Sequence, residues 1–170
     1  MITANDTGFD PARDPVPCLH RPLARSPSPR SLLAVTLAEK LTQLTADLAI
    51  IDDPQERLGV VVDRAKKLPL LADTERTDAH RVRGCISLVH LVGEVRDGHC
   101  YFRCEADGPL VRGLVALLCN FYSHATPADI AAFDPDPLEA LDLARNLSPT
   151  RRHGLASARA TIRAFAEKHI

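Results

Sequence analysis

Apolar residues recur at three- and four-residue steps in the first long segment after residue 30, and this spacing predicts a helix. Ser31 can cap its start, and its apolar face consists of Leu33, Leu37, Leu41, Leu44 and Leu48. A second helix begins at the capping-box sequence Asp53-Pro54-Gln55-Glu56, which has proline at the first helical position. Pro69 stops that helix, and the polar residues 70–80 predict an irregular loop.

Strand signals fill the middle of the chain, and helical patterns return after them. Apolar and β-branched residues predict strands over 86–95 and 99–105, joined at Asp97-Gly98, which is a hairpin signal. Residues 110–122 are apolar almost all round, as in a centrally buried helix. Polar residues followed by proline predict three more helix starts, at Thr126-Pro127, Asp136-Pro137 and Ser148-Pro149. This order of helices, hairpin and helices indicates an α+β domain over residues 31–170.

The first 30 residues differ from the rest of the chain. They are poor in large apolar side chains and rich in proline and arginine. Such a segment buries too little apolar area to offset the entropy of ordering it, so residues 1–30 are predicted to be a disordered tail. Cys18 lies in this tail and receives no role.

Composition narrows the class of protein. The chain has 170 residues and a formal net charge of −1, so no bulk electrostatic argument favours nucleic acid or a membrane surface. No apolar run approaches the ~20 residues that span a bilayer. The five cysteines form no CxxC pair, and an odd number fits a reducing cytoplasm better than a disulfide framework. We therefore expect a cytoplasmic protein that binds neither nucleic acid nor membrane.

Candidate chemistry is concentrated in residues 81–91, RVRGCISLVHL. Gly84 suits a sharp turn that presents Cys85 at the start of the first strand. Arg81 and Arg83 can stabilise a thiolate by charge, and the thiolate rather than the thiol is the nucleophile. Taken alone, a cysteine here is more often a small buried hydrophobe, because free cysteine is among the most buried residue types.

This stretch is followed by DGPLVRGL at 107–114 and LSPTRRHGL at 147–155, and the three motifs together resemble the SufE/CsdE family of sulfur-acceptor proteins. The resemblance implies a SufE/IscU-like fold, with an antiparallel sheet of about three strands packed against helices. It also implies that Cys85 takes sulfur from the persulfide of a SufS/CsdA-like cysteine desulfurase, stimulates that enzyme and passes the sulfur to an iron–sulfur scaffold. Pyridoxal phosphate belongs to the desulfurase, so this chain is expected to hold no cofactor and no metal. It would be a sulfur-transfer accessory protein rather than a stand-alone enzyme.

Residues that match the family motifs around the cysteine are expected to bind the partner. They are Arg83 and Gly84 beside Cys85, and Arg151 in the Ser-Pro-Thr-Arg segment. Asp107, which matches an acidic position of the family, is also counted among the partner-binding residues, and its favoured structural role is the N-cap of the buried helix. Structural roles are expected for two further matches, Arg112 and Gly113.

Three positions depart from the family pattern. His90 stands where the family usually has tryptophan, and Ile86 stands where a polar residue is common. The tripeptide Cys104-Glu105-Ala106 replaces a turn of the Gly-Asp-Ser kind. His90 raises a first alternative, a hydrolase with a Cys85–His90 pair. Five residues of strand span about 16 Å, and an odd separation puts the two side chains on opposite faces, which counts against the pair.

A metal or iron–sulfur scaffold is the second alternative. Zinc–sulfur bonds of ~2.3 Å require ligand sulfurs within about 4 Å of each other, whereas Cys100 and Cys104 would lie about 13 Å apart along a strand. Cys119, in the apolar helix, is expected in the core. The sequence leaves open which desulfurase and acceptor are served and whether the chain forms a homodimer. The candidate scaffold ligands are Cys85, Cys100, Cys104 and one of His90, His99 or His124.

Overall fold

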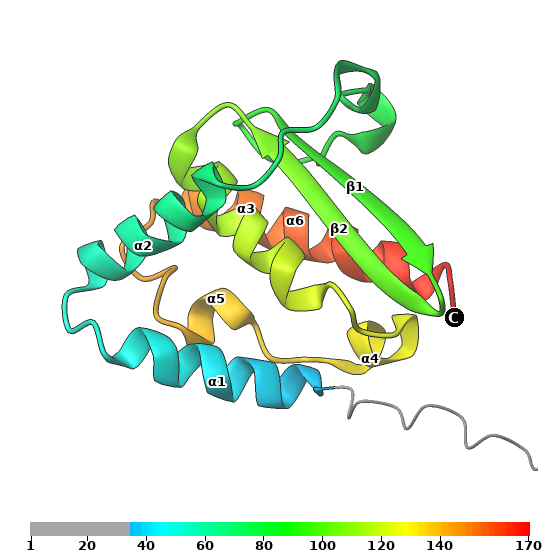
Figure 1. The fold of residues 1–170 in the computed structure, drawn as a ribbon. Helices are drawn as coiled ribbons and strands as arrows, with labels where there is room; N and C mark the ends of the chain where they lie inside the picture. The colour runs from blue at the N-terminus through cyan, green and yellow to red at the C-terminus, as the bar shows by residue number, and fades with distance from the viewer. Residues whose placement is uncertain (1–34) are drawn as a thin grey trace, which may run out of the picture. The chain divides into compact units, whose positions relative to one another are not determined.

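The computed structural model describes residues 35–170, so the predicted tail over 1–30, with Cys18, and Ser31 and Leu33 lie outside the described residues. Figure 1 shows a β-hairpin packed against helices, with two short 3₁₀ turns in the segment that leads into the hairpin. The α+β fold class is therefore confirmed. In chain order the elements are α1 (Leu37–Ala49), α2 (Pro54–Lys66), η1 (Asp73–Glu75), η2 (Asp78–His80), β1 (Val89–Arg96), β2 (His99–Ala106), α3 (Pro109–Tyr122), α4 (Pro127–Ala132), α5 (Pro137–Ala140) and α6 (Pro149–Glu167).

The first helix starts later than the apolar pattern predicts. α1 begins at Leu37, because Thr36 and Glu39 form a capping box in front of it. The Thr36 hydroxyl accepts the Glu39 N–H at 3.2 Å, and the Glu39 carboxylate accepts the Thr36 N–H at 2.8 Å. The predicted start at Ser31 is thus wrong, since the capping box fixes the helix end more strongly than the leucine spacing does. In α2 the predicted cap at Asp53 is confirmed, with its carboxylate accepting Gln55 N–H at 2.6 Å. The return bond from Glu56 that would complete the predicted capping box does not form in the described structure.

β1 and β2 pair antiparallel from Val89 opposite Ala106 to Arg96 opposite His99. Asp97 and Gly98 both have positive φ, 50° and 75°, so the predicted Asp-Gly turn is confirmed. The first strand starts at Val89, and residues 86–88 belong to a loop instead of the predicted strand. Apolar composition alone did not separate these three residues from the strand.

The sheet of the described residues has two strands, one fewer than the resemblance implies. What stands in place of a third strand is a single bridge between Arg81 and His90. Val82 N–H donates to Val89 O at 2.9 Å, and the chain then turns away at Gly84, which has a φ of 82°. The pairing therefore stops after one step.

The core lies between the hairpin and the helices beneath it, chiefly α3 and α6 (Figure 1). Cys100, Phe102 and Cys104 on one face of β2 are buried, as the alternation predicts. α3 is buried along most of its length, and Gly113 lets α2 approach so closely that a Cβ there would lie 3.0 Å from Val62 Cα. The structural role of Gly113 is thus confirmed. Asp107 is not the N-cap of α3, because Gly108 occupies that position.

The outer edge of β2 is covered by the residues that follow α3. Cys100 N–H donates to Ala125 O at 2.8 Å, and His124 N–H donates to Cys100 O at 2.8 Å. Phe102 N–H donates to the Ser123 hydroxyl at 3.0 Å. This segment therefore satisfies backbone groups that a bare strand edge would expose. Within residues 35–170, no helix combines the length and the apolar character needed to cross a membrane.

Candidate functional site

Cys85 lies in a short loop between the Arg81–His90 bridge and β1, which we call the cysteine loop (residues 83–88). Gly84 sits in its turn at a φ of 82°, a backbone conformation that costs other residues roughly 1–2 kcal/mol. Backbone hydrogen bonds hold both ends of the loop: Val82 N–H to Val89 O at one end, and Asp107 N–H to Leu88 O, at 3.3 Å, at the other. The turn at Gly84 is thus confirmed, although it leads into a loop and not directly into a strand.

The thiol rests on α6. A Cβ built on Gly154 would lie 2.6 Å from Cys85 Sγ and 3.4 Å from Cys85 Cβ, so only glycine leaves room for the cysteine there. Gly154 is buried and Cys85 is half-buried, packed at the margin of the hydrophobic core. The next residue, Ile86, is 84% exposed. The loop therefore presents a partly sheltered thiol beside an exposed apolar side chain.

Two polar side chains of the same helix lie against the glycine that precedes the thiol. A Cβ built on Gly84 would lie 3.0 Å from Ser157 Oγ and 3.5 Å from His153 Nε2. The Ser157 hydroxyl also donates to His153 O at 3.0 Å, which fixes it on the helix. His153 belongs to one of the quoted motifs but received no role from the sequence, because nothing in the spacing joins residue 153 to residue 84.

Positive side chains are clustered in sequence around this contact. Arg83 is exposed on the loop, and Arg151 and Arg152 are exposed in the first turns of α6, just before Gly154. Ser148 caps α6 and accepts the Arg151 N–H at 3.4 Å, while the Arg151 side chain stays exposed. Arg83 and Gly84 thus adjoin Cys85 in the loop, and Arg151 lies three residues before Gly154, which contacts the thiol. Asp107 reaches the loop through its backbone N–H, which donates to Leu88 O.

The other described cysteines are buried. Cys100 is 0% exposed, and burial raises the pKa of its thiol. Cys119 in α3 has a hydrogen bond with Cys104, and this bond, together with burial, raises the pKa of Cys119 well above its ordinary value. Raised thiol pKa values and burial both make Cys100 and Cys119 poor nucleophiles.

The two alternative sites do not assemble in the described part of the chain. No group of three or more His, Cys, Asp or Glu side chains in residues 35–170 is placed to hold a metal ion, so the scaffold alternative has no support there. His90 is 7% exposed within β1, opposite Glu105. The strand-spacing argument against a Cys85–His90 pair was wrong, because residues 86–88 are not strand. The histidine that approaches the cysteine loop is His153 instead.

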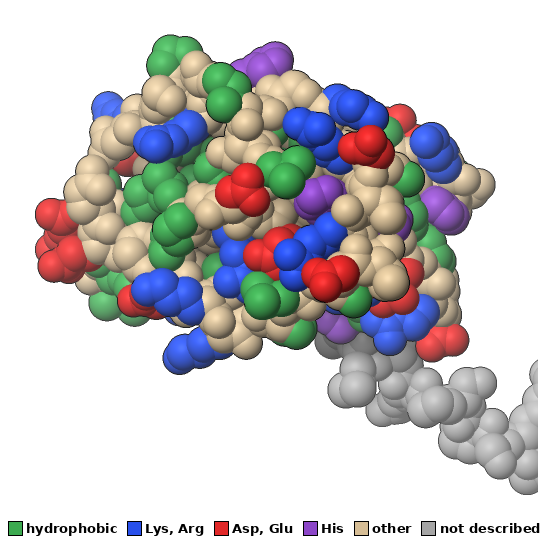
Figure 2. Space-filling view, turned by 90° about the horizontal axis from the view of Figure 1, so that it is seen from above, with side chains coloured by type: hydrophobic (Ala, Val, Ile, Leu, Met, Phe, Trp, Pro, Cys, Tyr) green, Lys and Arg blue, Asp and Glu red, His purple; other side chains and the backbone are tan. Residues whose placement is uncertain are grey.

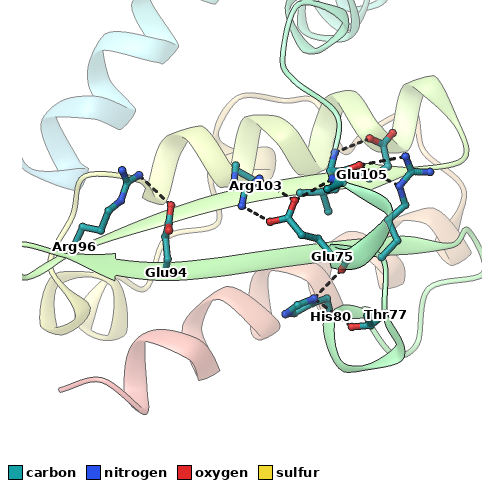
Figure 3. A network of polar contacts seen from close by, with 10 residues as sticks. Glu75, Thr77, His80, Glu94, Arg96, Arg103 and Glu105 are labelled. Atoms are coloured by element: carbon teal, nitrogen blue, oxygen red, sulfur yellow. Dashed lines mark hydrogen bonds and ion pairs between the residues drawn. The ribbon is translucent and has the colours of Figure 1, made fainter.

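An ion pair between Glu75 and Arg103 fastens the preceding segment, residues 70–80, to the sheet, as Figure 3 shows. Glu75 binds Arg103 of β2 through both carboxylate oxygens, and this ion-paired hydrogen bond lowers the pKa of Glu75. His80 Nδ1 is 2.7 Å from Glu75 O. The approach to the cysteine loop is therefore anchored to the sheet.

A second pair ties the end of β2 to the chain after α2. Glu105 is 3.4 Å from the Arg112 guanidinium, and its carboxylate accepts Leu71 N–H at 3.4 Å. Arg112 also donates to Leu68 O at 3.0 Å, so its predicted structural role is confirmed.

Figure 2 shows basic and acidic side chains side by side on the face seen there, without the single-sign patch that nucleic acid would favour.

Comparison with a solved structure agrees with the fold. The solution structure of a hypothetical protein from Thermus thermophilus aligns with a TM-score of 0.63 at 20% sequence identity. The match covers 76% of this chain and 94% of that one. At this level of identity the similarity concerns the fold.

Sequence relatives are closer. The chain is 36% identical over 122 residues to an uncharacterized SufE-like protein of Rhizobium etli, covering 69% of this chain and 82% of that one. It is 33% identical over 135 residues to a similar protein of Rhizobium meliloti, covering 76% and 96%. A Synechocystis protein, also named as uncharacterized and SufE-like, is 32% identical over 119 residues, covering 70% and 75%.

The family model described as "SufE: Fe-S metabolism associated domain" matches residues 42–166. The match includes the cysteine loop, the hairpin and the part of α6 on which the thiol rests. It assigns a role in iron–sulfur metabolism, and with the three relatives it shows that this chain belongs to the SufE family.

Proposed function

We propose that this protein carries sulfur on Cys85, which it takes as a persulfide from a cysteine desulfurase. One observation carries the proposal: of the four cysteines in residues 35–170, Cys85 is only half-buried and sits on a turn, whereas the other three are in the core. The family match supports iron–sulfur metabolism as the setting and a cysteine desulfurase as the general kind of partner.

Sulfur moves in this proposal by an exchange that needs no oxidant. The Cys85 thiolate attacks the outer sulfur of the persulfide on the desulfurase. A sulfur–sulfur bond forms on Cys85 while the one on the desulfurase breaks, and the desulfurase thiolate leaves. The exposed arginines of the loop and of α6 offer charge to the partner, and the exposed Ile86 beside the thiol offers apolar contact.

The remaining roles follow from this transfer. Pyridoxal phosphate, which releases sulfur from free cysteine, resides on the desulfurase, and this chain acts in the cytoplasm as its accessory protein. Arg83, Gly84 and Arg151 belong to the surface that the desulfurase covers, with Asp107 at its border. The persulfide then passes to an iron–sulfur scaffold.

Mass spectrometry tests the proposal directly. After incubation with a cysteine desulfurase and cysteine, the peptide that contains Cys85 should gain the mass of one sulfur. Cys85→Ser should gain none and should fail to raise sulfide release in the presence of a reductant. Cys18→Ser, which removes a thiol outside the described residues, is the matched control and should behave like the unmodified chain. Sulfur on another cysteine, or undiminished stimulation by Cys85→Ser, would refute the proposal.

A further inference from the structure

The fold places the His153 imidazole against Gly84, the residue that precedes the thiol-bearing Cys85. Gly84 lies against His153 Nε2, and Cys85 Sγ lies against Gly154. Two consecutive residues of the cysteine loop therefore pack over two consecutive residues of α6. The helix residues that meet the thiol and the preceding glycine are therefore neighbours in one turn of α6.

The His153 ring is exposed and has no hydrogen-bond partner among the described residues. By contrast, the described histidines His80, His99 and His169 all use Nδ1 in a contact with a backbone oxygen. A ring without such a partner keeps both nitrogens available for exchange with a neighbouring thiol.

The charged groups around the cysteine loop leave the role of proton acceptor to the imidazole. Arg83, Arg151 and Arg152 can stabilise a thiolate, but arginine does not accept a proton at neutral pH. Neither residues 83–88 nor residues 149–158 contain an aspartate or glutamate. Two acidic residues lie at the base of the loop, where Asp78 O accepts Arg81 N–H and Asp107 N–H donates to Leu88 O. Apart from these two aspartates, only the imidazole among these groups can accept a proton, and it lies against Gly84, the residue before Cys85.

We propose that His153 is the proton acceptor for Cys85, an inference that rests on the proposed sulfur transfer. The Cys85 thiol proton passes, directly or through one water, to His153 Nε2, and the resulting thiolate attacks the outer sulfur of the donor persulfide. The donor sulfur–sulfur bond breaks, a new one forms on Cys85, and the departing donor thiolate takes the proton back from Nε2. Atoms, electrons and protons balance without any further reactant.

Alkylation of Cys85 by iodoacetamide, followed on its peptide by mass spectrometry, tests this step without a desulfurase. The rate in the unmodified chain should rise through a step between about pH 5 and pH 8, where imidazoles lose their proton. His153→Gln should lack this step, and its rate at pH 7 should be lower on the order of tenfold. Arg152→Gln removes the neighbouring charge but keeps the base, so it should retain the step. An unchanged step and rate in His153→Gln would overturn the inference.

Chemical rescue separates proton transfer from packing. His153→Ala should alkylate slowly, and free imidazole in the buffer should restore much of its rate. Slow alkylation that imidazole leaves unchanged would overturn the inference in favour of a packing role. A His153→Gln chain that loses the pH step, while the unmodified chain takes no sulfur from any desulfurase, would refute the proposed function and support His153 as the base. If instead the unmodified chain takes up sulfur and His153→Gln keeps the pH step, the proposed function would be supported and the role of His153 as base would be refuted.

Discussion

Replacing Gly154 with alanine should displace the cysteine loop from α6. The added methyl would lie 2.6 Å from Cys85 Sγ, about 1 Å inside the ordinary separation of about 3.5–4.0 Å between non-bonded atoms. Overpacking of this kind costs about 1–3 kcal/mol. Alanine in a helix interior gains about 1 kcal/mol over glycine, so the free energy of unfolding should change by between about 0 and −2 kcal/mol.

A second glycine in the chain isolates the clash. Gly59 lies within α2, and a Cβ built there meets nothing within 4 Å. Gly59→Ala should therefore raise the free energy of unfolding by about 0.5–1 kcal/mol through helix propensity alone. Urea unfolding of both variants should separate them by about 1–3 kcal/mol.

The alkylation rate of Cys85 shows whether the clash displaces the loop. If the loop lifts from α6, Cys85 in Gly154→Ala should alkylate faster than in the unmodified chain, and in Gly59→Ala it should not. A Gly154→Ala chain as stable as Gly59→Ala, with unchanged alkylation, would refute the close packing of Cys85 on this helix.

Further expectations concern the turn, the ion pair, metals and the tail. Gly84→Ala should lose about 1–2 kcal/mol in urea unfolding from its positive φ, and more than Gly98→Ala, because only at Gly84 would the Cβ also meet a neighbouring side chain. The pKa of Glu75 is lowered in the folded state, so its contribution to the free energy of unfolding should be present at neutral pH. This contribution should be lost as acid protonates the folded carboxylate. Unfolding measured between about pH 6 and pH 3 should show a smaller loss in Arg103→Gln than in the unmodified chain. A chelator should leave the circular dichroism spectrum unchanged, and a loss of structure with release of stoichiometric metal would revive the scaffold alternative. Removal of residues 1–30 should shift the thermal midpoint by no more than about 2 °C, and a larger drop would show that this segment stabilises the domain.

Local patterns predicted most of the fold because local contacts decide it. Asp53 caps α2 through the N–H groups two and three residues further on, and the Asp97-Gly98 turn needs positive φ at both positions. The same locality explains the error at Ser31, where the Thr36–Glu39 capping box outweighed the spacing of leucines. The loop over residues 86–88 was harder to predict, because the long-range contact from Asp107 to Leu88 holds it out of the strand.

The candidate site could be predicted only in part. Gly84 and Cys85 are adjacent in sequence, so the turn that presents the thiol was visible there. The floor of the site comes from α6, and the contact of Gly154 with Cys85 joins residues far apart in the chain. Family resemblance marked Gly154 and Arg151 as motif positions without saying what they touch. His90 drew attention because it is near Cys85 in sequence, whereas His153 lies beside the loop in space.

The edges of the hairpin also affect the tendency of the protein to aggregate through its sheet. A two-stranded sheet has two edges, and eight-residue strands left open on both sides would offer long templates for strand addition by another chain. The residues after α3 occupy backbone groups at Cys100 and Phe102 on one edge, and Arg81 and Val82 occupy the other next to the cysteine loop. A partner arriving at this loop therefore meets the first backbone groups of β1 already paired. We expect it to recognise side chains, and the same arrangement lowers the tendency to aggregate through the sheet.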